Sequence, residues 1–242
     1  MAEILVVIPA YNEEANIKSV VERLIREYPQ LDYVIINDGS TDRTAKICEE
    51  EGFRVVNLSQ NLGLAGAFQT GMQFAWRHGY EYAVQFDGDG QHRPEYIEPM
   101  RDKMKEGYDI VIASRFVTEK KPKTMRMLGS NLIQTAIRLT TGVTIHDPTS
   151  GMRMFNRRTM EEFANRLNYG PEPDTVSYLI REGANVAEIQ VEMDERIGGV
   201  SYLTPWKASL YMLRMLCSIL VIQNFRKREK CFCTEERKEN AR

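Results

Sequence analysis

The chain is poor in cysteine, nearly neutral and without a long apolar run, and each shortage excludes a class of protein. Four cysteines in 242 residues do not supply the disulfide framework of a small secreted domain. A net charge of −2 argues against a general nucleic-acid binder, because binding to phosphates requires a surplus of lysine and arginine. The longest charge-free apolar run near the end, residues 215–225, has 11 residues, whereas a membrane-spanning helix needs roughly 20.

The first residues lack the basic segment and the cleavage site of a signal peptide, so we expect a cytosolic protein with reduced thiols. Charge is distributed unevenly along the chain. Residues 226–242 carry seven lysines and arginines against four glutamates, a local charge of +3, which leaves −5 for residues 1–225. A basic end on an acidic body indicates a segment that contacts an anionic surface.

The sequence does contain a regular alternation of short apolar segments and longer segments with helical spacing. The expected strands are residues 4–8, 33–36, 53–56, 82–86 and 108–113, and the expected helices are residues 13–28, 42–51, 64–78 and 94–106. This alternation predicts a single α/β domain with a mostly parallel, Rossmann-like sheet and helices on both faces. Ligands of such sheets bind beyond the carboxyl ends of the strands, so the residues that follow the strands are the candidate site.

Beyond residue 113 the alternation becomes irregular. Residues 117–130 are polar, basic and weakly periodic, which predicts a loop leading into a helix that ends near Thr140. A second irregular stretch, residues 196–204, precedes a last helix expected over residues 205–225. We therefore divide the chain into an α/β domain that carries the candidate site, an amphipathic helix and a polar tail, at residues 1–204, 205–230 and 231–242.

Polar residues follow the first two expected strands. The first strand leads into Pro9, Tyr11 and Glu13, and the second leads into Asp38 beside a glycine. A carboxylate just beyond a strand end can accept a hydrogen bond from a ribose hydroxyl or a base N–H. Residues 38–42 fit an ordinary turn with a helix cap equally well, so these two strand ends leave both interpretations open.

The fourth expected strand leads into Asp87, Asp89 and Gln91, which alternate with glycines. Glycine lets the backbone approach a ligand closely, and carboxylate and amide oxygens are ligands that suit Mg²⁺ and Mn²⁺. A divalent ion at this position would neutralise a diphosphate leaving group. His92 fits either a further metal ligand or an ordinary loop residue. Together with the two preceding strand ends, this motif predicts a nucleotide site with a metal ion.

Seven segments, in this order and spacing, resemble family 2 glycosyltransferases of the GT-A fold, and among them the dolichyl- or polyprenyl-phosphate sugar transferases. The segments are VVIPAYNEE (6–14), INDGSTDRT (36–44), NLGLAGAFQTG (61–71), QFDGDGQHRPE (85–95), ASRF (113–116), DPTSGMR (147–153) and RIGGVS (196–201). The resemblance spans roughly residues 4–204 and is more specific to the family than to the substrate. It implies that residues 1–204 form a GT-A catalytic domain.

The resemblance also implies roles for individual residues. The expected nucleotide-binding residues are Pro9, Tyr11, Glu13, Asp38 and Asp87. The expected ligands of Mg²⁺ or Mn²⁺ are Asp87, Asp89 and Gln91, and Asp89 is expected to be catalytic. The residues expected around the acceptor phosphate are Arg115, Arg126, Ser130 and Arg196. Arginine suits phosphate because it is permanently charged and forks onto two oxygens.

Simpler structural interpretations stay open beside these roles. Arg126 also fits a surface cation, and Ser130 also fits a helix cap. Arg153 fits a substrate contact or a bridge between strands. The glycines and alanines of residues 61–71 fit part of the site or a helix that packs closely on the sheet.

The nature of the acceptor depends on whether a general base is present. A sugar hydroxyl needs a base, usually a carboxylate, whereas a phosphate monoester is largely dianionic at pH 7 and needs none. Glu172 and Asp174 are the candidate catalytic carboxylates, although an acidic residue that opens a helix also fits the helix dipole. Hydroxyl-transferring relatives carry an adjacent Glu-Asp pair. The intervening Pro173 departs from that pattern, which puts a base role in doubt and favours contacts to the donor sugar.

The expected C-terminal helix combines an apolar face with cations. Its apolar residues recur near helical spacing, ahead of the basic residues 226–230: Trp206, Leu210, Leu213, Leu216, Leu220 and Val221. Such a helix fits an interfacial helix on an anionic membrane, a contact for a small membrane-protein partner or a second copy, or a helix docked on the sheet. Cys231 and Cys233 fit either acylated or unmodified tail thiols.

The sequence therefore predicts a metal-dependent inverting glycosyltransferase, peripheral on the cytosolic face of a membrane, that moves one sugar from a UDP- or GDP-hexose to polyprenyl phosphate. Two alternatives stay open: transfer to a saccharide hydroxyl in polysaccharide synthesis, and a sugar-nucleotide-binding module without catalysis. The intact metal motif and the arginine set argue against the second, since binding alone requires no acceptor-phosphate cluster. The donor base, the hexose and the lipid length stay open.

Overall fold

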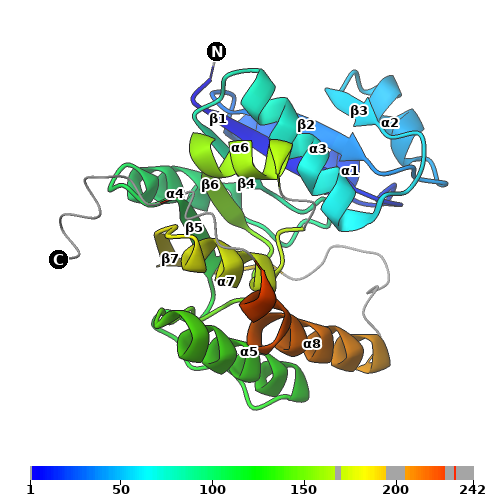
Figure 1. Ribbon diagram of the computed structural model, residues 1–242. Helices are drawn as coiled ribbons and strands as arrows, with labels where there is room; N and C mark the ends of the chain where they lie inside the picture. The colour runs from blue at the N-terminus through cyan, green and yellow to red at the C-terminus, as the bar shows by residue number, and fades with distance from the viewer. Residues whose placement is uncertain (1, 167–169, 195–204, 227–231, 233–242) are drawn as a thin grey trace.

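The computed structural model describes residues 2–166, 170–194, 205–226 and 232 (Figure 1). Within these residues, seven strands form one sheet in the order β3-β2-β1-β4-β6-β5-β7. The strands are β1 (Ile4–Ala10), β2 (Asp32–Asn37), β3 (Val55–Asn57), β4 (Tyr82–Gln85), β5 (Ile110–Ser114), β6 (Arg153–Asn156) and β7 (Val186–Gln190). Only β6 runs antiparallel to its neighbours within this sheet, which confirms the predicted, mostly parallel arrangement.

Helices cover both faces of the sheet, as the continuous apolar strands require. One face carries α1 (Ile17–Glu27), α2 (Thr44–Glu50) and α4 (Ile97–Met104), and the other carries α3 (Gly63–Arg77), α6 (Arg157–Asn165) and α7 (Pro173–Arg181). β1 contributes alternately to the two cores. Leu5 and Val7 belong to the core that contains α3, whereas Val6 and Ile8 belong to the core that contains α1.

A glycine explains how closely α3 approaches the sheet. A Cβ atom built on Gly71 would lie 2.1 Å from Val7 Cγ1, so any larger residue would force the helix away from β1. At this position the close-packing interpretation of residues 61–71 is confirmed.

Two further helices, α5 (Met125–Thr141) and α8 (Pro205–Leu220), lie side by side and pack against α7 (Figure 1). α8 continues into a short 3₁₀ helix, η2 (Ile222–Phe225), as expected for a last helix over residues 205–225. On its inner side Met215 and Ile219 are fully buried. By length and composition, Ala208–Phe225 is one candidate membrane span among the described residues. It is longer than the charge-free run of 11 residues because it tolerates Arg214.

The topology brings the loops after six strands to one edge of the sheet. All the described strands except β6 run in the same direction, so their carboxyl ends share this edge. The antiparallel β6 begins there, and Arg153 at its start pairs with Gln85 and Ile112. β6 and β7 were not expected from the sequence, and the third strand lies at residues 55–57 rather than 53–56. The loop before β6 therefore joins the other loops at this edge.

Candidate active site

The ends of β1 and β2 form the expected nucleotide half of the site. Asp38 is 3% exposed, its N–H donates to the Ala10 carbonyl at 2.9 Å, and its Oδ1 accepts from the Leu62 N–H at 2.7 Å. This second bond ties the end of β2 to the start of α3. The buried carboxylate of Asp38 is thus fixed beside the backbone that follows β1, where a ligand beyond the strand ends would lie.

Side chains from the second loop hold the loop after β1 in place. The Asn12 N–H donates to Ser40 Oγ at 3.0 Å, and Asn12 Oδ1 accepts from the Thr41 N–H at 2.9 Å. The Glu13 N–H donates to Thr44 Oγ1 at 2.8 Å. Asn12 itself has φ of +56°, a left-handed conformation that asparagine tolerates. The structure therefore brings the predicted residues of the two loops together: Pro9, Tyr11, Glu13 and Asp38.

The loop after β4 presents the two predicted metal carboxylates. Asp89 is 7% exposed, and its Oδ1 accepts from the Gln91 N–H at 3.1 Å. Asp87 is more open, and its Oδ1 accepts from Gln85 Nε2 at 3.1 Å. The turn between them packs on β1, since a Cβ on Gly88 would lie 3.5 Å from the Pro9 carbonyl oxygen. The metal motif and the nucleotide half thus adjoin.

His92 positions this loop through its backbone. The Asp87 N–H donates to His92 Nδ1 at 2.9 Å, which leaves the proton of a neutral ring on Nε2. Nε2 lies 3.6 Å from Asp87 Oδ2. The ring is 4% exposed and packs edge-on against Phe86. A neutral His92 with this hydrogen bond has no ring nitrogen available for a metal, so the loop-residue interpretation is the one that fits.

The donor set fits a hard divalent cation that shares its coordination with a diphosphate. Among the described residues, no group of three or more His, Cys, Asp or Glu side chains could enclose a metal ion. Two carboxylates and one amide are instead a typical Mg²⁺ set, because this ion keeps waters and binds substrate phosphates through its other positions. Space exists beside Asp87 because residue 151 is glycine: a Cβ there would lie 2.5 Å from Asp87 Oδ2.

The cations expected at the acceptor phosphate follow β5. Arg115 forks onto Asp147 through Nε at 2.7 Å and Nη2 at 3.0 Å, and Asp147 is fully buried. Lys121 lies in the same loop, between β5 and α5, and its Nζ donates to Ser130 Oγ at 3.2 Å. Ser130 is itself fully buried on α5, beneath this lysine. The structure thus brings together Arg115, Ser130 and one lysine that we did not predict.

Two other predicted arginines are not part of this cluster as the structure describes it. Arg126 is exposed in the first turn of α5 and has no hydrogen bond or ion pair with a described residue. Arg196 lies outside the described residues. Their acceptor roles stay predictions.

Arg153 is structural. It is 1% exposed, and its guanidinium donates to the Pro171 carbonyl and, at 2.7 Å, to the Pro148 carbonyl. It therefore bridges the loop before β6 and the segment before α7 rather than two strands. Its burial leaves no surface for a substrate.

Glu172 and Asp174 differ in their surroundings. Asp174 is buried; its Oδ1 accepts from the Thr175 N–H at 2.9 Å and its Oδ2 accepts from the Ser218 hydroxyl at 2.7 Å. Asp174 thus ties α7 to α8. Glu172 is half-buried, and burial together with the charge of Asp174 raises its pKa. The structure gives Asp174 a packing function, and the catalytic roles of both residues stay predictions.

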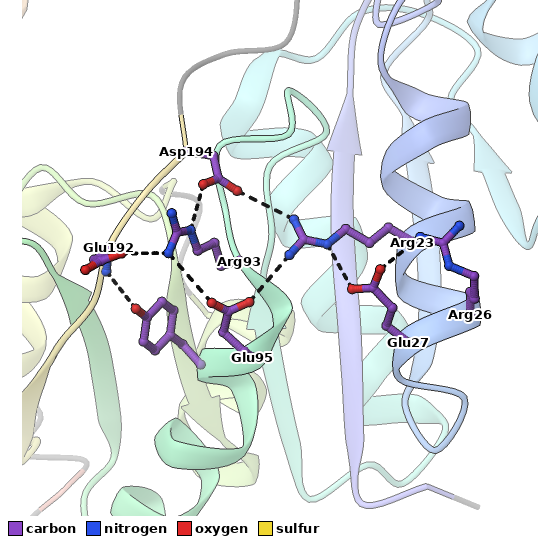
Figure 2. A network of polar contacts seen from close by, with 8 residues as sticks. Arg23, Arg26, Glu27, Arg93, Glu95, Glu192 and Asp194 are labelled. Atoms are coloured by element: carbon purple, nitrogen blue, oxygen red, sulfur yellow. Dashed lines mark hydrogen bonds and ion pairs between the residues drawn. The ribbon is translucent and has the colours of Figure 1, made fainter.

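An ion-pair network fixes the segment after β7 to the metal loop (Figure 2). The Asp194 N–H donates to the Gln91 carbonyl at 2.9 Å. Arg93 donates to Asp194 and to Glu192, both at 2.7 Å, and Arg23 on α1 reaches Asp194 at 3.6 Å. The segment after β7 is therefore fixed beside Gln91 where it leaves the sheet.

The site residues that sequence reasoning missed are Asp147, Gly151 and Lys121. The first two lie in the DPTSGMR segment, which resembled the family but received no role. Asp147 holds Arg115, and Gly151 lies against Asp87, so this one loop contacts a residue predicted to bind the acceptor and a residue predicted to bind the metal. The available signal was the resemblance of this segment to the family, which included a carboxylate and a glycine. Nothing in the sequence distinguished Lys121 from the lysines beside it.

Comparison with known proteins identifies the family. Residues 5–163 match the family described as Glycosyl transferase family 2. The chain belongs to this family. Polyprenol monophosphomannose synthase of Mycolicibacterium smegmatis is 31% identical over 213 residues, which cover 83% of this chain and 80% of the relative. UDP-N-acetylglucosamine–dolichyl-phosphate N-acetylglucosaminyltransferase of Methanococcus voltae is 32% identical over 216 residues, which cover 78% of this chain and 84% of the relative.

A solved structure confirms the fold of this family 2 glycosyltransferase. Glucosyl-3-phosphoglycerate synthase from Mycobacterium tuberculosis, crystallised with Mn²⁺, uridine diphosphate and phosphoglyceric acid, matches it with a TM-score of 0.65. The match covers 94% of this chain and 80% of that chain at 21% identity. The predicted GT-A architecture and the predicted enzyme class are therefore confirmed.

Proposed function

We propose that this glycosyltransferase transfers a single sugar, with inversion, from a UDP- or GDP-hexose to polyprenyl phosphate at the cytosolic face of a membrane. The observation that carries the proposal is the loop of residues 147–152. It places Gly151 against the metal carboxylate Asp87 and Asp147 against the cation Arg115. One loop thus lies between the carboxylate proposed to bind the metal and the arginine proposed to bind the acceptor phosphate.

Different residues bind the donor and the acceptor. Asp38, Glu13 and Tyr11 bind the nucleoside beyond β1 and β2. Asp87, Asp89 and Gln91 would hold Mg²⁺ or Mn²⁺, which would supply positive charge to offset the negative charge on the leaving diphosphate. On the other side, Arg115, oriented by Asp147, holds the acceptor phosphate for attack from the opposite face of the sugar. No base is required, because the phosphate monoester is already largely dianionic at pH 7.

The experiment that tests the proposal is a transfer assay with labelled UDP- and GDP-sugars, purified protein, Mn²⁺ and polyprenyl phosphate. Label that enters the organic phase, and that stays aqueous when EDTA is present, supports the proposal. Label that becomes polymer-bound in the aqueous phase assigns a hydroxyl acceptor instead. Donor binding without transfer, across metals and acceptors, contradicts catalysis.

An Asp174→Asn variant distinguishes the two acceptors. Asparagine preserves both contacts, because its oxygen accepts from the Thr175 N–H and its amide donates to Ser218 Oγ. We expect kcat to fall by less than about tenfold with a phosphate acceptor, whereas loss of a general base costs about a hundredfold or more. Ser218→Ala is the control for packing, since it removes the hydrogen bond between α8 and Asp174 and leaves the carboxylate. A fall in kcat of about a hundredfold or more in Asp174→Asn, but not in Ser218→Ala, would contradict a phosphate acceptor.

The pair of helices α5 and α8 supports a membrane-bound acceptor. Of the fifteen exposed large apolar side chains of the described residues, four lie on α5 and six lie within residues 205–225, which form α8, Val221 and η2. Residues 125–141 and 205–226 also contain five basic residues and no acidic one: Arg126, Arg138, Lys207, Arg214 and Arg226. Exposed leucines among cations are typical of a surface that inserts at the headgroups of an anionic membrane. Part of the apolar face of α8 packs on the protein, and the remainder is available to lipid.

Membrane binding should depend on exposed leucines of both helices. Leu139 on α5 is 77% exposed and Leu213 on α8 is 58% exposed. Replacing both with glutamine should weaken binding to vesicles containing phosphatidylglycerol by about 3 kcal/mol, or about a hundredfold, because each side chain no longer enters the apolar layer. Vesicle flotation measures this change. Ile25→Gln, at an exposed position on α1, should leave binding unchanged; an equal loss there contradicts the α5–α8 surface.

A further inference from the structure

One lysine in the loop between β5 and α5 points inward while its neighbours point outward. Lys121 is half-buried, whereas Lys120 and Lys123 are exposed. Its Nζ donates to Ser130 Oγ at 3.2 Å and to Gln134 Oε1 at 3.0 Å, both on α5. Lysine ordinarily extends its ammonium into water, so this inward position requires a local explanation.

The partners that Lys121 contacts directly are neutral. A hydroxyl and an amide oxygen accept from it, and none of the ion pairs between described residues includes it. Burial lowers the pKa of Lys121, and this effect exceeds that of the negative charges of Asp147 and Glu188, which act to raise it. A half-buried ammonium without a contacting carboxylate is a strong donor that lacks a direct counterion.

A second cation, Arg115, contacts the same aromatic ring as this lysine, and its own counterion is engaged. Arg115 Cζ and Lys121 Nζ lie 5.1 and 5.8 Å from the centre of the same ring, that of Phe116. Asp147 accepts from Arg115 and from Thr149 Oγ1 at 3.2 Å. Glu188 accepts from the His146 and Asp147 N–H groups. Asp147 is therefore engaged by Arg115, and Glu188 by backbone N–H groups, so neither carboxylate contacts the Lys121 ammonium.

We propose that Lys121 recognises the second negative charge of the acceptor's terminal phosphate, so that the site selects a phosphate monoester over a phosphodiester or a carboxylate. This inference rests on the proposed function, in which the acceptor carries a phosphate. Arg115 contributes a planar, oriented donor, and Lys121 contributes a point charge for a further oxygen. Ser130 and Gln134 hold the ammonium in place. Ser130, which we predicted to lie at the acceptor phosphate, then contributes by positioning Lys121.

The test measures binding without turnover. A short prenyl phosphate, citronellyl phosphate, and its methyl diester are titrated calorimetrically against wild type, Lys121→Gln, Lys121→Arg and Lys123→Gln. Wild type should prefer the monoester by at least about tenfold, the effect of one charge-assisted hydrogen bond. Lys121→Gln should lose about tenfold in affinity for the monoester and little for the diester. Lys121→Arg should recover the preference, and Lys123→Gln, which removes the same charge from an exposed position, should retain it.

Several results would overturn the inference. Equal losses for the two esters in Lys121→Gln would indicate a structural role, and equal losses in Lys121→Gln and Lys123→Gln would indicate general attraction of anions. Wild-type binding of inorganic phosphate as tight as that of citronellyl phosphate would assign the site to a free anion rather than to an acceptor headgroup. Absence of glycolipid in the transfer assay, with the monoester preference intact, would count against the proposed function alone.

Discussion

Replacing Asp89 with asparagine is expected to lower kcat for sugar transfer by about a hundredfold to a thousandfold. The reason is that the charge on the leaving diphosphate develops at this loop, and one lost electrostatic contact to a developing charge typically has an effect of this size. Asparagine retains the Oδ1 that accepts from the Gln91 N–H, so the turn should keep its shape. The variant therefore removes charge from the metal site with little change of structure.

The measurements are kcat and the Mn²⁺ concentration for half-maximal activity. The affinity for Mn²⁺ should fall along with kcat. The free energy of unfolding, measured by thermal denaturation, should change by less than about 1 kcal/mol. Asp102→Asn is the matched control, because Asp102 is an exposed carboxylate on α4 that pairs with Arg101 at 2.8 Å. If Asp89→Asn kept wild-type activity and an unchanged Mn²⁺ titration, Asp89 would not be a metal ligand.

The position of the three residues predicted to bind a metal was predictable because they lie close together in the sequence. Asp87, Asp89 and Gln91 directly follow a buried strand, so the sequence alone places their side chains at the edge where ligands bind. The strong apolar segments likewise predicted five strands and the helices between them. Such inferences depend on neighbours within a few residues, which a sequence displays directly.

The acceptor half was only partly predictable because its contacts are distant in sequence. Arg115 and Asp147 are 32 residues apart, and the structure joins them through a loop that enters β6. β6 is four residues long and begins with the fully buried Arg153, which breaks the apolar pattern that identifies a strand. Without β6, the loop of residues 147–152 had no place in the predicted fold. Lys121 became distinct from its neighbours only once α5 supplied Ser130 and Gln134 as its partners.

In the loop of residues 147–152, a Gly151→Ala substitution should cause a large loss of the transfer rate. The new Cβ would lie 2.5 Å from Asp87 Oδ2, closer than atoms tolerate, so the carboxylate must move. Because that oxygen is the end of a flexible side chain, the fold should accommodate the change with little loss of stability. A displacement of about 1 Å in a group that positions reactants can lower the rate about a hundredfold, and we expect a loss of that size.

The variant should act through Asp87, and a double-mutant cycle tests this. If it does, Gly151→Ala combined with Asp87→Ala should be no slower than Asp87→Ala alone, because the displaced group is already absent. Gly129→Ala is the matched control: its Cβ would lie 3.0 Å from the flexible Met212 side chain, between α5 and α8 and away from the metal loop. Normal activity in Gly151→Ala, or multiplied losses in the double variant, would show that the loop before β6 does not determine the position of the metal carboxylate. A loss in Gly151→Ala that is absent from Gly129→Ala, and absent in the Asp87→Ala background, would show that this loop, which also holds Arg115 through Asp147, determines the position of the Asp87 carboxylate.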